Sequence, residues 1–119
     1  MENGTGTHII GDLKMCDQNY LFGLDMEAIK KKSIEIIQKN SFTVLGSYFH
    51  RFENNSFTGI IALSESHVSM HTWPELGIVN IDVYVCNYNH DNTEATRRTF
   101  EEISALFHSE KVEKREIKR

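Results

Sequence analysis

Hydroxyl, imidazole and carboxyl groups are concentrated in one short stretch of the chain, 63–74, whose sequence is LSESHVSMHTWP. Segments that form strands are usually filled with apolar and β-branched residues. Polar groups this close together must therefore face solvent, pair with one another, or carry function. An exposed strand face with hydrogen-bonded hydroxyls explains the pattern as well as a reactive site does. From the residues alone, both interpretations stay open.

Two familiar kinds of site are disfavoured by the spacing of these residues. A hydrolase nucleophile normally lies in a glycine-flanked elbow or a protease-type flank, and neither surrounds the serines or cysteines here. His67 and His71 are four residues apart, which on a strand separates them by about 13 Å. One metal ion cannot bridge that distance, and Cys16 and Cys86 lack the paired spacing of a zinc site. We therefore predict no metal site.

The elements that must position this stretch are predicted from periodicity and turn residues. Two segments have a helical spacing of apolar residues behind a capping side chain. One follows Asp25, and the other runs from Asn92 or Thr93 to about Phe107. Runs of β-branched and aromatic residues predict strands, and polar residues predict turns at 16–20 and 53–56. The predicted strands are 8–14, 42–52, 58–63, 78–85 and 112–117, and the stretch 63–74 is also expected to be strand.

The order of these elements predicts an α+β fold. Two helices separated by a block of strands with hairpin-length links favour a two-layer sandwich, an antiparallel sheet with two helices on one face. A chain of 119 residues has the length of one domain, so we expect a single domain over residues 1–119. Helices on one face leave the other face of the sheet to be covered, and a second copy can cover it. We therefore expect a homodimer.

Composition and charge exclude several classes of function. The chain is 39% hydrophobic and 25% charged, which is typical of a globular protein. A net charge of -4 gives no reason to expect nucleic acid as a partner, because basic residues gather only at 111–119, where Glu113 and Glu116 interrupt them. No apolar N-terminal stretch predicts a signal peptide or a membrane span. We expect a cytoplasmic protein without membrane contact, whose two cysteines are free thiols.

Three groups of residues form a recognisable set: Ser64-Glu65-Ser66-His67, His71-Thr72-Trp73-Pro74-Glu75, and the pair Asp82 and Cys86. In identity and spacing they resemble the prokaryotic S-adenosylmethionine decarboxylase proenzymes, a family of pyruvoyl-dependent enzymes. Weaker similarity extends from Gly6, at the start of GTHIIGDLKMCD, through His50-Arg51-Phe52 to the last predicted strand. The resemblance therefore covers nearly the whole chain.

The resemblance implies that the chain makes its own cofactor by cutting itself between Glu65 and Ser66. The Ser66 hydroxyl attacks the carbonyl of Glu65 to give an ester. β-Elimination then frees residues 1–65, the β chain, and leaves Ser66 as a pyruvoyl group at the start of the α chain, 66–119. A planar amide resists such attack, so we expect this peptide to be strained and its oxyanion to be stabilised by donors.

Two further residues match family positions that assist this processing. His71 matches the processing histidine, and an imidazole can take up the serine α-proton near neutral pH. Thr58 matches a position where a hydroxyl assists, although the family often has serine there. Because threonine keeps the hydroxyl, we expect processing to survive.

In turnover, the resemblance implies that the substrate amine forms a Schiff base with the pyruvoyl ketone, which withdraws the electrons released as carbon dioxide leaves. The product would supply aminopropyl groups for spermidine synthesis. Cys86 matches the proton donor, although a free cysteine is more often a packing residue, as we interpret Cys16. Phe52 matches the aromatic residue that stacks on adenine, and Glu75 matches the carboxylate that binds the ribose hydroxyls. Without the resemblance, Phe52 would be assigned to the core.

The chain departs from the family pattern beside these residues. Where the family has an aromatic, a glycine, another aromatic and small residues, this chain has Leu76-Gly77-Ile78-Val79-Asn80, and Asn87 replaces the usual glycine after the cysteine. A decarboxylase of ornithine or arginine is therefore the alternative to an S-adenosylmethionine decarboxylase. A non-catalytic homologue that binds an active subunit is a third hypothesis. The intact Ser66, His71 and Cys86 argue against it.

Overall fold

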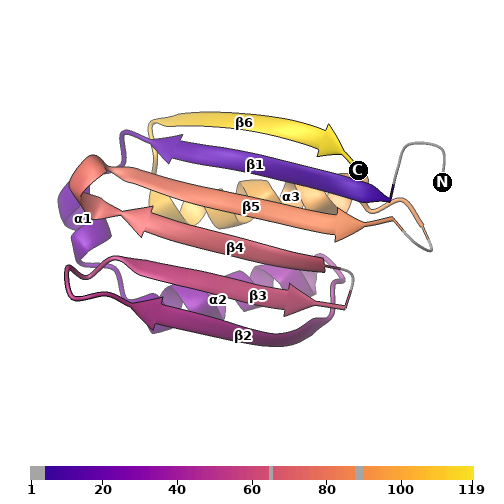
Figure 1. Ribbon diagram of the computed structural model, residues 1–119, viewed down its shortest axis with the longest axis horizontal. Helices are drawn as coiled ribbons and strands as arrows, with labels where there is room; N and C mark the ends of the chain where they lie inside the picture. The colour runs from indigo at the N-terminus through magenta and orange to yellow at the C-terminus, as the bar shows by residue number, and fades with distance from the viewer. Residues whose placement is uncertain (1–4, 65, 88–89) are drawn as a thin grey trace.

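A six-stranded antiparallel sheet with helices on one face forms the body of the protein (Figure 1). The computed structural model describes residues 5–64, 66–87 and 90–119. Its strands are β1 (Gly6–Lys14), β2 (Val44–Arg51), β3 (Phe57–Leu63), β4 (Ser66–Trp73), β5 (Ile78–Cys86) and β6 (Lys111–Lys118). Its helices are α1 (Gln18–Phe22), α2 (Met26–Lys39) and α3 (Thr93–Ser104), with 3-10 turns η1 (Pro74–Leu76) and η2 (Ala105–Phe107). The predicted α+β sandwich is confirmed.

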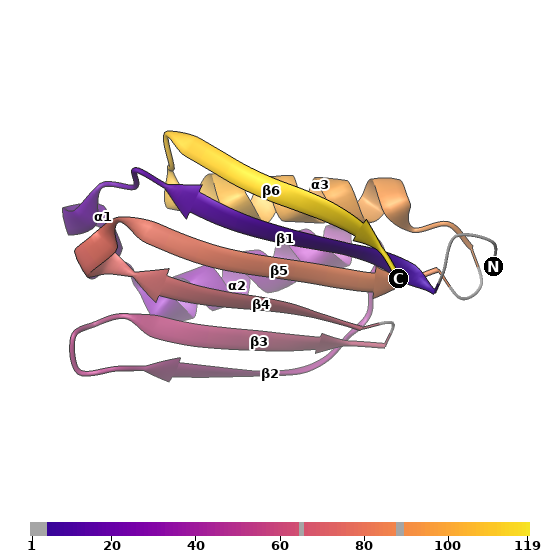
Figure 2. The same cartoon turned by 45° about the horizontal axis from the view of Figure 1, so that its top comes forward.

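The sheet interleaves the two halves of the chain. Its strand order is β2-β3-β4-β5-β1-β6, so the first strand of the chain lies between two strands from its second half (Figure 2). The register pairs β1 with both β5 and β6, and β3 with β4. Residues on either side of position 65 are therefore joined by three strand pairings.

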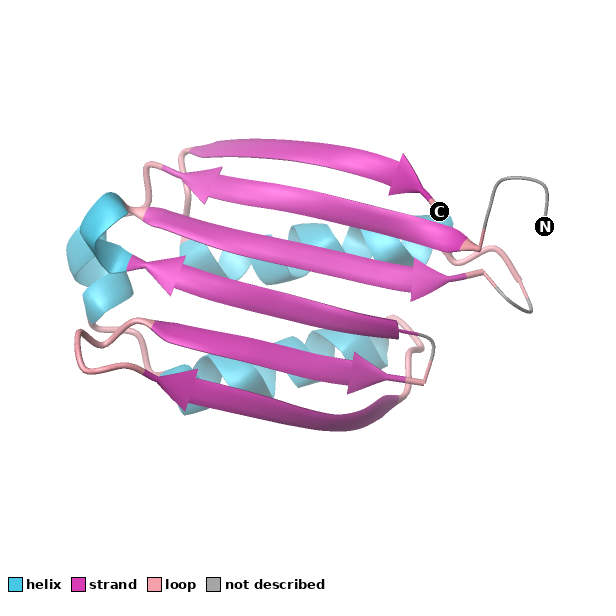
Figure 3. Cartoon of the chain, in the orientation of Figure 1, coloured by secondary structure: helices cyan, strands magenta, loops and turns pink. Residues whose placement is uncertain are grey.

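Both predicted helices are present and cover the same face of the sheet. α2 begins after Asp25, whose carboxylate accepts hydrogen bonds from the N–H groups of Glu27 and Ala28. It packs on β2 and β3, whereas α3 packs on β5 and β1, and Figure 3 shows both helices behind the sheet. Within the described ranges, no helix covers the opposite face.

A third, shorter helix replaces the turn that is predicted at 16–20. Asp17 caps α1 by accepting a hydrogen bond from the N–H of Tyr20, and Gly23 ends the helix. Only Leu21 among its five residues is buried. A helix this short has too few apolar positions for periodicity to distinguish it from a turn.

The core lies between the sheet and the two long helices. Every second residue of β5, from Val79 to Val85, is buried against them. Gly11 of β1 allows the ring of Phe100 to pack against the strand, because a Cβ at position 11 would lie 2.3 Å from that ring. Alternation along a strand then places the remaining side chains on the other side of the sheet.

We call this other side of the sheet the open face. By register and alternation it carries His8 and Asp12 of β1, Asn80, Asp82, Tyr84 and Cys86 of β5, His67, Ser69, His71 and Trp73 of β4, Thr58 and Ile60 of β3, and Tyr48 and His50 of β2. Three of its large side chains, Tyr48, Ile60 and Trp73, are exposed. Most of the residues with reactive side chains therefore lie on the uncovered side of the sheet.

Candidate active site

The residues predicted to do chemistry lie at opposite ends of the sheet. Ser66 begins β4 and pairs with Val85, so it lies beside Cys86 at the end of β5; we call this pair the reactive end. His71 is five residues farther along β4, about 17 Å away at roughly 3.3 Å per residue. The residues at that far end form what we call the pocket end: Phe52, Thr58, His71 and Glu75. One chain therefore does not bring its two groups of predicted residues together.

At the reactive end, Ser66 directly follows the hairpin link between β3 and β4. Leu63, the last residue of β3, pairs with Ser66, so the link consists of residues 64 and 65 alone. The N–H of Ser64 donates to the carbonyl of Thr43 at 3.0 Å. Glu65 lies outside the described residues, so the strain predicted for the Glu65–Ser66 peptide stays a prediction.

The backbone around Cys86 is fixed by an asparagine that the family pattern does not contain. Asn87 donates its N–H to the carbonyl of Thr5 at 2.7 Å and accepts a hydrogen bond from the N–H of Asn92 at 2.8 Å. The amide of Asn92 in turn donates to the carbonyl of Cys86 at 2.9 Å. The half-buried thiol of Cys86 is free of disulfide bonding. Asn87 therefore ties the end of β5 to the start of α3.

Two histidines lie on the open face near this end. The His8 ring lies edge-on to Tyr84 at 5.6 Å and to His67 at 6.5 Å, and its Nε2 is 4.0 Å from the carboxylate of Asp82. Burial lowers the pKa of His8 below its ordinary value, and Arg119 and His67 lower this pKa further, whereas Asp82 opposes them. His8 is therefore neutral at pH 7.

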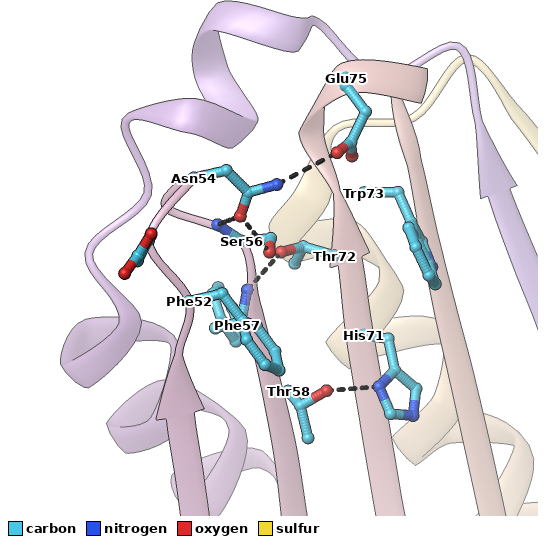
Figure 4. A pocket seen from close by; sticks show the side chains of 10 residues that line it. Phe52, Asn54, Ser56, Phe57, Thr58, His71, Thr72, Trp73 and Glu75 are labelled. Carbon is cyan, nitrogen blue, oxygen red and sulfur yellow. Dashed lines mark hydrogen bonds between the residues drawn. The ribbon is translucent and has the colours of Figure 1, made fainter.

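The pocket end contains a pocket of about 610 Å³ (Figure 4). It is formed by the turn between β2 and β3, the start of β3, the end of β4 and η1. Aromatic rings, hydroxyls and carboxylates share its wall, which suits a ligand with a planar apolar part and several polar groups. Its lining residues are Phe52, Glu53, Asn54, Ser56, Phe57, Thr58, His71, Thr72, Trp73 and Glu75.

Phe52 lies at the wall of this pocket and not in the core. Its side chain is 48% exposed, and the ring of His50 packs edge-on against it with 4.7 Å between centroids. Figure 4 shows Phe52 and Trp73 on opposite sides of the pocket. A half-exposed aromatic ring at a pocket is available to stack on a ligand.

Glu75 is held at the rim of the pocket by neighbouring amides. Asn54 donates to its carboxylate at 3.1 Å, and Gln18 donates to its backbone carbonyl at 3.1 Å. The carbonyl oxygen of the Asn54 side chain accepts hydrogen bonds from the N–H and the hydroxyl of Ser56. The orientation of the Asn54 amide, and through it that of the Glu75 carboxylate, is therefore fixed by the turn.

Thr58 and His71 are direct cross-strand neighbours, although they are far apart in the sequence. They pair in the register of β3 and β4, and Thr58 Oγ1 and His71 Nδ1 share a hydrogen bond of 2.5 Å. A hydroxyl bound to one ring nitrogen orients the imidazole and leaves Nε2 for proton transfer.

Three residues with clear places in this site have no role in the sequence-based prediction. Trp73 belongs to the recognised HTWPE motif but is given no function there, and Asn54 is assigned to a turn. Asn80 is noted only as a departure from the family pattern, yet it hydrogen bonds to Trp73. The contacts of Asn54 and Asn80 join residues on different elements, so sequence spacing does not predict them.

Neither a metal centre nor a membrane span occurs in the described part of the chain. No group of three or more His, Cys, Asp or Glu side chains there is placed to hold a metal ion. The helices of these ranges are also too short and too polar to cross a membrane.

Comparison with known proteins identifies the family of the chain. The family model for S-adenosylmethionine decarboxylase matches residues 7–119. The chain belongs to the S-adenosylmethionine decarboxylase family. It is 38% identical to the S-adenosylmethionine decarboxylase proenzyme of Archaeoglobus fulgidus over 87 residues, which cover 68% of this chain and 70% of the relative. The identity to the proenzyme of Methanococcus maripaludis is 35% over 114 residues, 96% of this chain and 88% of that one.

A solved structure from the same family has the same fold. The chain is similar to the crystal structure of the adenosylmethionine decarboxylase from Aquifex aeolicus, with a TM-score of 0.84 and 26% sequence identity. The similarity covers 98% of this chain and 92% of that one. Membership of the S-adenosylmethionine decarboxylase family therefore extends to the architecture of the whole chain.

Proposed function

We propose that this chain is a self-processing, pyruvoyl-dependent S-adenosylmethionine decarboxylase that acts as a cytoplasmic homodimer. Membership of the family supports the activity, since the relatives named above are S-adenosylmethionine decarboxylase proenzymes. The observation that carries the proposal is the position of the matching residues: Ser66 and Cys86 lie at adjoining ends of β4 and β5, and Thr58 and His71 pair at the other end of the same sheet, beside the pocket. A single catalytic domain over residues 1–119 is part of the proposal.

Processing uses groups of the chain itself. Ser66 Oγ attacks the carbonyl carbon of Glu65, the C–N bond breaks, and an ester links the two residues. A base then removes the α-proton of residue 66, and β-elimination releases residues 1–65 with a terminal carboxylate. The dehydroalanine left at position 66 tautomerises to an imine, and water hydrolyses it to the pyruvoyl group and ammonia.

The surroundings of Ser66 fit this product. The residue lies at the mouth of a two-residue hairpin, is half-buried, and is adjacent to the strand that ends in Cys86. A pyruvoyl ketone there supplies the electron sink that decarboxylation of an α-amino acid needs. Cys86 would return a proton to the substrate α-carbon, a role that suits a thiol because its S–H can be donated.

The separation of the two ends supports a homodimer with shared sites. The imidazole of His71, acting as the base, cannot reach the α-proton of Ser66 in the same chain, because the two residues are about 17 Å apart. A two-fold axis that lies between two open faces and runs across their strands places the reactive end of one copy over the pocket end of the other. Each of the two sites would then combine Ser66 and Cys86 of one protomer with Thr58, His71 and Glu75 of its partner. The exposed apolar residues of the open face would be buried by the same contact.

The interleaved sheet allows the protein to survive its own cleavage. After a cut at position 65, β1, β2 and β3 belong to one fragment and β4, β5 and β6 to the other. β1 stays hydrogen bonded between β5 and β6, and β3 stays bonded to β4. Separating the fragments would break three strand pairings. We expect them to co-purify and to part only in denaturant.

The pocket supports S-adenosylmethionine as the substrate. The rings of Phe52 and Trp73 suit a purine beside a sulfonium cation, and the fixed carboxylate of Glu75 suits the two hydroxyls of a ribose. Ornithine and arginine lack the ring and the diol and would leave both features unused. Residues 76–80 depart from the family pattern, so ornithine and arginine are tested beside S-adenosylmethionine as alternative substrates.

The experiment that tests the proposal traps the substrate on the protein. Purified protein is incubated with S-adenosylmethionine, ornithine or arginine, treated with cyanoborohydride to make the amine–ketone adduct permanent, and analysed by intact mass. We expect two fragments, 1–65 and 66–119, with an adduct of S-adenosylmethionine on the second. The Ser66→Ala variant, uncut and without adduct, is the control. An adduct only with ornithine or arginine would overturn the substrate assignment. An uncut wild-type chain would overturn the proposal that the chain is a self-processing enzyme.

A further inference from the structure

Trp73 is the only tryptophan of the chain and lines the pocket from the open face. Its side chain is 45% exposed, so packing alone holds it weakly. Its orientation depends on a hydrogen bond, in which the indole Nε1–H donates to the side-chain oxygen of Asn80 at 2.6 Å. Figure 4 shows the indole along one side of the pocket, across from Phe52.

Asn80 is itself held by a charged residue on the next strand. Its amide nitrogen donates to the carboxylate of Asp12 at 2.7 Å, and the two residues are direct partners in the register of β1 and β5. A carboxylate only accepts hydrogen bonds, and an indole N–H only donates. The amide of Asn80 can satisfy both neighbours in one orientation alone, so Asp12 determines which of its atoms faces Trp73.

This chain of hydrogen bonds crosses three strands and reaches the pocket wall. It passes from Asp12 on β1 through Asn80 on β5 to Trp73 on β4. Asn80 lies in the stretch where the family usually has small residues, and the side chain of a small residue could not reach the indole. The hydrogen bonds of Asn80 therefore need its amide side chain.

We propose that Asn80, oriented by Asp12, is a positioning residue that fixes the indole of Trp73 as a wall of the pocket. Through the indole it sets the affinity of the site for the planar aromatic part of the substrate. Asn80 itself need not touch the substrate. The identity of that substrate rests on the proposed function, whereas the positioning of Trp73 does not.

Kinetics of the Asn80→Ala variant test the recognition half of this inference. Losing one hydrogen bond behind the pocket wall should raise KM for S-adenosylmethionine by about 2- to 10-fold. Self-cleavage and kcat should stay within about 2-fold of wild type, since the side chain of Asn80 binds Trp73 and Asp12 and not Ser66, Cys86 or His71. Gln38→Ala, on the exposed side of α2, is the matched control and should change none of these quantities.

A pair of exchanges separates the hydrogen bonds from the volume of the side chain. Asn80→Asp alone places a second carboxylate against Asp12, so like charges repel and KM should rise at least as much as in Asn80→Ala. The double variant Asp12→Asn/Asn80→Asp restores one amide and one carboxylate in exchanged positions. It should return KM toward the wild-type value. A structural defect unrelated to Trp73 would not be rescued in this way.

Fluorescence tests the positioning half without any substrate, because all tryptophan emission comes from Trp73. The Asn80→Ala variant should be quenched more strongly by acrylamide than wild type, and the double exchange should restore the wild-type value. Unchanged quenching overturns the inference whatever the substrate is. Stronger quenching with an unchanged KM overturns the role in recognition. A wild-type chain that does not act on S-adenosylmethionine refutes the proposed function and the recognition role, while quenching still decides the positioning of Trp73.

Discussion

The two ends of the sheet are built differently. The pocket end is cross-linked by side chains: Asn54 holds Glu75, Thr58 binds His71, and Asn80 binds Trp73. At the reactive end, the backbone pairing of β4 and β5 places Ser66 beside Cys86, and the side-chain amide of Asn92 donates to the backbone carbonyl of Cys86. Side chains at the pocket end are thus linked to one another, whereas Ser66 and Cys86 are held through their backbone. In the dimer that we propose, a second copy bridges the distance between the ends and completes each site.

The largest expected effect comes from removing the nucleophile at the reactive end. Ser66→Ala should leave a single uncut chain of 13.8 kDa and abolish decarboxylation, because no pyruvoyl group can form. The pocket end should survive, so S-adenosylmethionine should still change the fluorescence of Trp73 in this variant. Intact mass and a fluorescence titration measure the two results. Loss of binding together with loss of cleavage would show that the two ends are not independent.

The next effect tests whether the two ends meet across a dimer. His71→Ala and Ser66→Ala should each be uncut alone. When they are co-expressed in equal amounts, a mixed dimer contains one site with both residues intact, so about half of the His71→Ala chains should be cleaved. A tag on one chain identifies the cut product by mass. No cleavage in the mixture would refute the shared site.

Part of this arrangement is predictable from the sequence, because helix caps and strand alternation depend on residues that are close together in the chain. Asp25 before an apolar helical face gives the start of α2, and alternating residues at 78–85 give the buried strand β5. The recognised motifs also identify the residues of both ends. The strand spacing that separates His67 from His71 by about 13 Å applies equally to Ser66 and His71, so their separation was available from the sequence.

The contacts that complete the pocket were not predictable in this way. Thr58 and His71 are 13 residues apart in the sequence and meet only through the register of β3 and β4. The contact between Trp73 and Asn80 likewise requires the pairing of β4 and β5. Strand register depends on the hydrophobic pattern of the whole sheet. Turn residues and short motifs, taken alone, do not determine it.

A smaller effect is expected from loosening the pocket end alone. Asn54→Ala removes the donor that holds the Glu75 carboxylate, so KM for S-adenosylmethionine should rise by about 3- to 10-fold. Self-cleavage should be unchanged, because Asn54 contacts neither Ser66 nor the hydrogen-bonded pair of Thr58 and His71. Asn54→Asp should be worse, since it places a second carboxylate beside Glu75. Steady-state kinetics and intact mass measure both variants. Slower cleavage in Asn54→Ala would contradict the expectation that Asn54 affects substrate binding alone.

The smallest effect concerns the protons of the reactive end. Burial lowers the pKa of His8 in the folded protein below its ordinary value near 6.5, so the unfolded chain takes up this proton first as the pH falls. The stability contributed by neutral His8 is complete above about pH 6.5 and is lost as the pH falls toward the lowered value. Thermal unfolding followed between about pH 7.5 and 5.5 should therefore show a falling Tm, with a shallower slope in His8→Gln. Equal slopes would mean that protonation of His8 does not destabilise this end, and that the neighbouring carboxylate of Asp82 compensates for burial.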